Sequence, residues 1–107
     1  MDLNTYQKKA LTTARDEGFE LMHRVLGLIG EAGEIAEKLK KWQRDDKADL
    51  AKLDREALAK ELGDVLWYVA TLADYLGYPL EEIGKINVEK LASRASRDKI
   101  KGSGDNR

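Results

Sequence analysis

Apolar residues recur at a helical period along most of this chain, and they predict four helices. The first is expected over residues 3–15, the second over 19–42, the third over 54–77 and the fourth over 80–97. No segment of the sequence shows the two-residue alternation of apolar and polar side chains that is typical of a β-strand. The pattern therefore predicts an all-α fold.

Local signals set the expected helix boundaries. Asn4 is the expected N-cap of the first helix, and Asp54 that of the third. Gly77 is a natural C′ residue for the third helix, because glycine adopts the left-handed conformation that often ends a helix. Pro79 suits the first turn of the fourth helix, where its missing N–H has no partner to lose.

Two polar segments lie outside these helices. Residues 43–55 form the most polar stretch of the chain, and we expect a loop there with a helical turn near 48–53. This loop exceeds the usual connection length, which favours a functional loop or one that is exchanged between subunits. We expect one helical domain over residues 1–98 and a flexible polar tail over 99–107, with folding of the tail over a site as the alternative.

The second and third helices repeat one arrangement of charge. On a helical projection each has a broad apolar stripe with two acids at its edge, Glu31 and Glu34 on one helix and Glu61 and Asp64 on the other. The i, i+3 spacing places both acids of a pair on one face. Like charges so placed repel by a few tenths of a kcal/mol. If the helices pack antiparallel, the four carboxylates converge on one point, and the pattern predicts a bound divalent metal.

A single Glu-x-x-Glu is weak support for a metal, because 36% of the residues are charged and such a pair is most often a solvated helix edge. Repetition of the pair in one register, with Gly33 and Gly63 at the same internal position, favours the metal. Each glycine costs about 1 kcal/mol relative to alanine inside a helix. We therefore expect a reason for the two glycines, either close helix contact or room beside the acids.

Composition limits the functions open to the chain. With 107 residues it is one small domain with a modest core, so oligomerisation is expected. A net charge of −1 predicts no general attraction to nucleic acid or to an anionic membrane. The absence of cysteine excludes disulfides, thiol nucleophiles and cysteine-based zinc sites. No signal peptide is recognisable and no apolar run approaches the ~18 residues of a membrane span, so a cytoplasmic location is expected.

Four carboxylates without histidine or cysteine would form an all-oxygen site. Such a site suits Mg²⁺, Mn²⁺ or Ca²⁺ rather than zinc or copper, and Mg²⁺ usually takes further ligands from substrate phosphates. It can clamp a polyphosphate and generate a hydroxide from a bound water. A carboxylate that is not fully committed to the metal could accept the proton of that water.

The two acid pairs, Glu-x-x-Glu followed by Glu-x-x-Asp, resemble the signature of the MazG-like, all-α nucleoside triphosphate pyrophosphohydrolases. The resemblance extends over nearly the whole chain, and its further matching parts are residues 28–35, residues 62–68, Asn87, Lys90 and Arg94.

This resemblance implies a Mg²⁺-dependent enzyme, with Mn²⁺ as a substitute, that maintains the nucleotide pool. It would cleave a nucleoside triphosphate between the α- and β-phosphates to give a monophosphate and pyrophosphate. The four acids would bind the metal, with Glu34 and Glu61 also catalytic, and a homodimer or dimer of dimers would build each site. Asn87, Lys90 and Arg94 would face phosphate or sugar, and Lys90 would also act in catalysis by stabilising the leaving pyrophosphate.

Three more residues are candidates for substrate binding. Lys38 either meets phosphate or forms an ordinary i, i+4 pair with Glu34. Tyr68 either stacks on a base or ribose or lies at the rim of the core. Trp42 is either a platform for the base or a core or subunit contact. The lone His23 is not expected to be catalytic.

The alternative to an enzyme is a non-catalytic helical dimer that binds a nucleotide or a protein partner through its acidic edge. A family member that binds nucleotide without cleaving it is a third hypothesis. Base and sugar preference does not follow from these residues.

Overall fold

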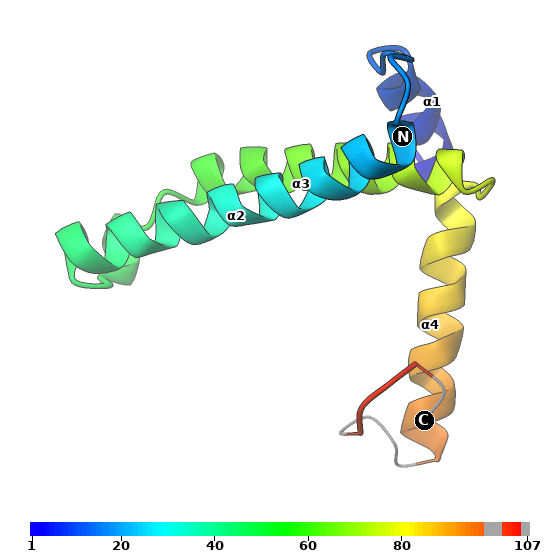
Figure 1. Cartoon of the computed structure of the whole chain (residues 1–107). Helices are drawn as coiled ribbons and strands as arrows, with labels where there is room; N and C mark the ends of the chain where they lie inside the picture. Colours follow the sequence, from blue (N-terminus) through cyan, green and yellow to red (C-terminus); the bar gives the residue numbers. More distant parts are fainter. Residues whose placement is uncertain (98–101, 106–107) are drawn as a thin grey trace.

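The computed structural model describes residues 1–97 and 102–105. These described ranges contain four α-helices and a short 3₁₀ helix η1 (Figure 1). Their bounds are α1 Leu3–Leu11, α2 Glu20–Asp46, η1 Leu50–Lys52, α3 Arg55–Tyr75 and α4 Leu80–Ser96. No strand occurs within the described ranges, which confirms the predicted all-α class.

Helices α2 and α3 lie side by side as a long antiparallel hairpin, as predicted (Figure 1). Helix α2 runs further than expected, to Asp46, so the loop shortens to residues 47–54. The chain turns at Lys47, which adopts the left-handed conformation at φ 51°, and η1 then forms within the predicted helical turn. The indole N–H of Trp42 donates to the carbonyl of Asp49 at 2.8 Å and ties this loop to α2.

Helix α1 begins at Leu3, as predicted, but its N-cap and its last residue differ from the prediction. The expected N-cap Asn4 is wrong, because Asp2 caps the helix by accepting a hydrogen bond from the backbone N–H of Thr5 at 2.7 Å. The helix ends at Leu11 rather than at residue 15. The next two residues are threonines whose hydroxyls donate to carbonyls of the last turn, which is how such side chains compete with helical bonding.

The ends of α3 follow their predicted signals. Asp54 caps the helix and accepts a hydrogen bond from the N–H of Ala57 at 3.0 Å. Gly77 has φ +84° and lies one residue beyond the C-cap, as expected for C′. Pro79 is the N-cap of α4 rather than a residue of its first turn, and it provides no side-chain cap.

Side chains of α1 supply the missing cap of α4. The side-chain oxygen of Asn4 accepts a hydrogen bond from the backbone N–H of Glu81 at 3.0 Å. The side-chain oxygen of Gln7 accepts one from the N–H of Leu80, also at 3.0 Å. Both N–H groups lie in the first turn of α4, where no intrahelical acceptor is available. The contact fixes α4 against α1.

Gln7 also joins α1 to α3 and to the segment that follows α3. Its side-chain amide donates to the carbonyl of Ala70 at 3.0 Å and to that of Tyr78 at 3.1 Å. The side chain is buried beside the small apolar core formed by Ala10, Ala70 and Leu80. One buried amide thus holds together three helices.

The isolated chain leaves much of its apolar surface uncovered. Along α2, which is described throughout, no residue is buried, and Leu26 and Ile29 are 61% and 64% exposed. The accessible surface is 8102 Å², against about 6000 Å² for a compact monomer of this mass. The radius of gyration is 16.8 Å, against about 13 Å for a compact domain of this length. None of the described helices combines the length and the hydropathy that a membrane-spanning helix requires.

We predict that Gln7→Ala lowers the free energy of unfolding by about 2–3 kcal/mol, because buried backbone groups lose their partners. Urea denaturation followed by circular dichroism, at one fixed protein concentration, measures the change. Gln43→Ala, an exposed substitution on α2, is the control and should stay within about 0.5 kcal/mol of wild type. Equal midpoints for all three proteins would contradict the role assigned to Gln7.

Candidate metal and substrate site

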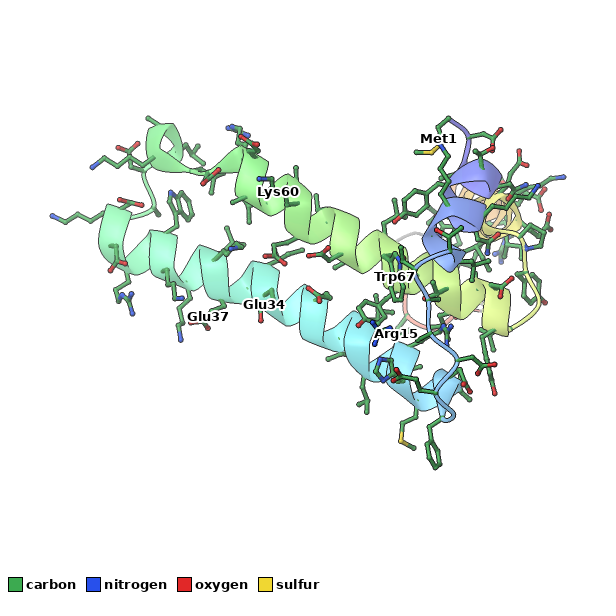
Figure 2. All side chains as sticks on the ribbon, turned by 90° about the horizontal axis from the view of Figure 1, so that it is seen from above. Met1, Arg15, Glu34, Glu37, Lys60 and Trp67 are labelled. Carbon is green, nitrogen blue, oxygen red and sulfur yellow. The ribbon has the colours of Figure 1, made fainter. Side chains whose placement is uncertain are left out.

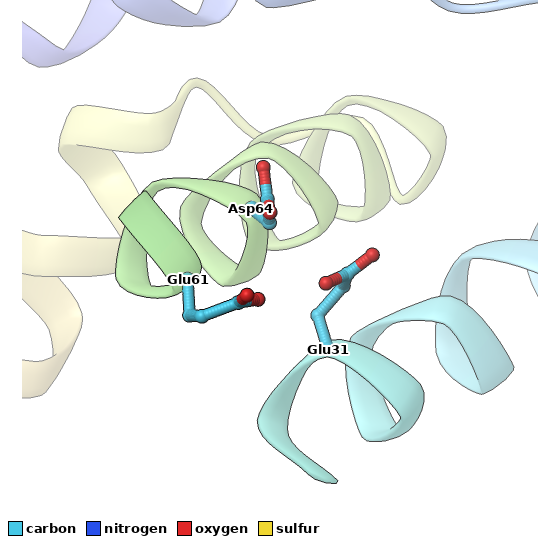
Figure 3. Close-up of side chains that lie close together, drawn as sticks. All are labelled: Glu31, Glu61 and Asp64. Atoms are coloured by element: carbon cyan, nitrogen blue, oxygen red, sulfur yellow. The ribbon is translucent and has the colours of Figure 1, made fainter. Parts of the chain in front are cut away.

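Three of the four predicted acids come together at the middle of the hairpin. Carboxylate oxygens of Glu31, on α2, and of Glu61 and Asp64, on α3, lie within 4.8 Å of one another (Figure 3). Glu31 and Glu61 are half-buried, and Asp64 is exposed. The antiparallel packing of two helices with matching acid pairs produces this convergence. The group offers three oxygen ligands to one cation.

Glu34 is not a member of this group. It is exposed and lies one turn beyond Glu31 on α2, where Figure 2 shows it beside the next exposed acid, Glu37. Its part in metal binding and catalysis therefore stays a prediction.

The surroundings of Glu31 disfavour its charged form. Burial raises the pKa of Glu31, and the negative charges of Asp64, Glu61 and Glu34 raise it further. Partial loss of hydration and like-charge repulsion both disfavour the carboxylate. A divalent cation at this point would reverse the effect of the repulsion, because its charge is the largest in the site.

Lys38 already supplies one positive charge to the group. Its ammonium nitrogen lies 3.5 Å from a carboxylate oxygen of Glu61, across the hairpin. The expected local alternative was a pair with Glu34 on the same helix, and the ion pair in the structure is instead with the opposite helix. Lys38 and Trp42 line one cavity of about 250 Å³ at the loop end of the hairpin.

Tyr68 lies against α2 one turn from Glu31. A Cβ atom at Gly27 would overlap three ring carbons of Tyr68, so the glycine is what admits the ring. The ring also packs edge-on against Trp67, with centroids 4.9 Å apart. Tyr68 is half-buried, and this position is compatible with both of its predicted roles.

Gly33 and Gly63 have no such neighbour. A Cβ atom built at either position meets nothing within 4 Å. Close helix contact within the chain, one of the two expected reasons for these glycines, is therefore wrong. The open space at both positions leaves room for a group from outside the chain.

Helix α1 brings a residue to the site that the sequence did not indicate. Burial raises the pKa of the Tyr6 phenol, and the charge of Asp64 raises it further. The indole N–H of Trp67 donates to the carbonyl of Ala10 at 3.1 Å and to the hydroxyl of Thr13 at 2.9 Å, which fixes α1 across α3 (Figure 2). Because Tyr6 is remote in sequence, no local pattern could have predicted its position.

The three predicted residues of α4 are not brought to the acids within one chain. Helix α4 packs on α1 and α3 and then runs away from the hairpin (Figure 1). Asn87 is exposed. Lys90 binds the carboxylate of Asp105 at 3.0 Å, and Arg94 donates to the carbonyls of Gly104 and Asp105 at 3.1 and 3.0 Å. The predicted tail is otherwise outside the described residues.

Comparison with known proteins adds to this geometry. Residues 19–97 match the profile of the MazG nucleotide pyrophosphohydrolase domain. The chain is 49% identical over 87 residues to the Gene 37 protein of Mycobacterium phage L5, across 81% of this chain and 76% of that protein. It is 36% identical over 76 residues to the uncharacterized protein YvdC of Bacillus subtilis (strain 168), across 66% of this chain and 72% of that protein. No solved structure gives a significant match.

We predict that Glu31→Gln raises the melting temperature of the metal-free protein by about 1–3 °C at pH 7, because it removes like-charge repulsion. A carboxyl with a raised folded-state pKa contributes its full stability below its unfolded pKa and loses it as the pH rises through the folded value. The gain should therefore vanish near pH 4, where Glu31 itself is protonated.

Thermal unfolding in EDTA at the two pH values measures this difference. Glu37→Gln is the control, because Glu37 is exposed on the same helix and paired with Lys40. A gain at pH 7 that is equal in both variants would show that the acid group is not the cause.

Proposed function

Because this chain belongs to the family of the MazG nucleotide pyrophosphohydrolase domain, we propose that it hydrolyses a nucleoside triphosphate between the α- and β-phosphates in a Mg²⁺-dependent reaction. The products are a nucleoside monophosphate and pyrophosphate, and the role is housekeeping of the cytoplasmic nucleotide pool. The observation that carries the proposal is the convergence of Glu31, Glu61 and Asp64 from two helices.

The donor set of this group suits Mg²⁺. It offers carboxylate oxygens only, which are the ligands that a hard divalent cation prefers. Glu31, Glu61 and Asp64 would hold the ion, and Glu34 is the proposed fourth ligand. When bound, Mg²⁺ would polarise phosphate oxygens and lower the pKa of a bound water.

Residues of the chain carry the remaining steps. Glu34 and Glu61 are the two proposed catalytic acids, and of these Glu61 belongs to the converging group. A carboxylate that is not fully committed to the metal would accept the proton from the attacking water. Lys38, whose ammonium lies 3.5 Å from Glu61, is a proposed contact to phosphate. Tyr68 and Trp42 are the proposed contacts to the nucleoside. Lys90 and Arg94 provide an ammonium and a guanidinium for phosphate oxygens, with Asn87 for phosphate or sugar.

We further propose that the site is shared between copies of the chain, in a homodimer or a dimer of dimers. Within one chain α4 leads Lys90 and Arg94 away from the acids (Figure 1). The apolar side chains left exposed on α2 and α3 provide a surface on which a second copy can pack. A partner's α4 could then bring its cations to the acids of the first chain.

The first experiment offers a panel of canonical and modified nucleoside triphosphates to the protein with Mg²⁺ and identifies the products. We expect monophosphate and pyrophosphate, and no turnover in EDTA. Release of orthophosphate and diphosphate would contradict the proposed bond. Metal-dependent nucleotide binding without turnover would favour the non-catalytic alternative.

Glu61→Gln tests the metal assignment in the same assay. It should weaken Mn²⁺ binding in calorimetry and lower kcat/KM by about 10²-fold, or ~3 kcal/mol. Glu56→Gln is the matched control, because Glu56 lies on the same helix, exposed and paired with Lys60. Unchanged Mn²⁺ affinity in both variants would remove the support for a metal at this group.

We also predict that the protein sediments as a dimer or tetramer at micromolar concentration. The physical reason is that association lowers the free energy, because a second copy covers the exposed apolar side chains of α2 and α3. Analytical ultracentrifugation measures the mass. A stable 12.1 kDa monomer would contradict the shared site.

A further inference from the structure

The end of the described chain, residues 102–105, lies beside the C-terminal half of α4 (Figure 1). The carboxylate of Asp105 is 3.0 Å from the ammonium of Lys90 and 3.5 Å from the guanidinium of Arg94. These are the two cations to which the proposed function assigns phosphate. An anionic group of the protein therefore occupies them in this structure.

The buried guanidinium of Arg94 requires hydrogen-bond acceptors. Its side chain is only 5% exposed, and its Nε atom is buried and has no hydrogen-bond partner among the described residues. A guanidinium has five N–H donors and is always charged, so it needs acceptors when it is removed from water. The carbonyls of Gly104 and Asp105 provide two. If this segment leaves, other oxygens must replace it.

The ion pairs of Asp105 form in this structure, but they are weak enough for another anion to replace its carboxylate. Hydrogen bonding and the charge of Lys90, together with the hydrogen bond from Arg94, lower the pKa of Asp105, which keeps its carboxylate ionised. The side chain of Asp105 is 83% exposed, however, and exposed ion pairs contribute little to stability. A polyphosphate has several charged oxygens and can satisfy both cations at once.

We propose that Asp105 is an internal competitor for the phosphate groups of the substrate. It occupies Lys90 and Arg94 in the free protein, and a polyphosphate displaces it. This inference rests on the proposed function in taking these cations as the phosphate-binding ones. Its consequence is selectivity: pyrophosphate or a triphosphate displaces the carboxylate, whereas orthophosphate, with fewer charged oxygens, displaces it poorly.

The test measures binding of inorganic pyrophosphate to the full chain by calorimetry in EDTA, without metal or nucleotide. Asp105→Asn should raise the affinity about 2- to 5-fold, the factor that corresponds to loss of an exposed ion pair. Glu89→Gln is the matched control, because it removes the same charge next to Lys90 on the same helix. Glu89 should have a smaller effect, since it makes no contact with either cation among the described ion pairs.

Nitrogen-15 NMR gives an independent readout of displacement. Titration with pyrophosphate should move the backbone amide signals of Gly104 and Asp105 toward unfolded-chain positions, with the same midpoint as calorimetry. Orthophosphate at equal concentration should move them much less. In Lys90→Met the Asp105 signal should already be shifted before any pyrophosphate is added.

Several results would overturn the inference. They are an unchanged or lower affinity in Asp105→Asn, an equal gain in Glu89→Gln, absence of pyrophosphate binding to any variant, or signals of Gly104 and Asp105 that do not move on binding. The hydrolase proposal fails separately. Displacement of Asp105 by pyrophosphate without turnover of any triphosphate would support this inference and reject the hydrolase proposal. Turnover of a triphosphate with an unchanged KM in Asp105→Asn would support the hydrolase proposal and reject this inference.

Discussion

The rest of the structure depends on the antiparallel packing of α2 against α3. This packing holds like charges close together. Each helix alone carries two acids at the edge of an apolar stripe. Packed together, they bring Glu31, Glu61 and Asp64 within 4.8 Å. The folded state tolerates this repulsion since the carboxylates are at most half-buried and Lys38 offsets part of the charge. The arrangement makes sense physically as a site that gains stability from a cation.

Helix α4 carries like charges of the opposite sign. Lys90 and Arg94 are cations whose present partner, Asp105, is exposed and replaceable. A single group of the protein thus offsets part of the charge in each half of the proposed site, Lys38 for the acids and Asp105 for the cations. Metal and polyphosphate together would replace these partners with stronger ones. In the free protein the acids therefore keep an excess of negative charge and the two cations an excess of positive charge.

Shape separates the two halves. Gln7 and Asn4 fix α4 at an orientation that leads it away from the hairpin, so the cations and the acids of one chain stay apart. The apolar stripes of α2 and α3 also remain exposed, because α1 and α4 are too few to cover them. The proposed assembly, in which a second copy covers the stripes and completes the site, would account for both facts.

The sequence by itself determined what depends on near neighbours: the all-α class, the caps at Asp54 and Gly77, and the acids spaced one turn apart. Helical period and capping act over four or five residues, so they can be predicted without the fold. Only the tertiary structure decided that Lys38 pairs across the hairpin, that Tyr6 lies near Asp64, and that side chains of α1 cap α4. These contacts join residues that are remote in the chain, and their partners are selected by how helices pack. The same limit explains the wrong N-cap of α1, because the residue expected there was needed by another helix.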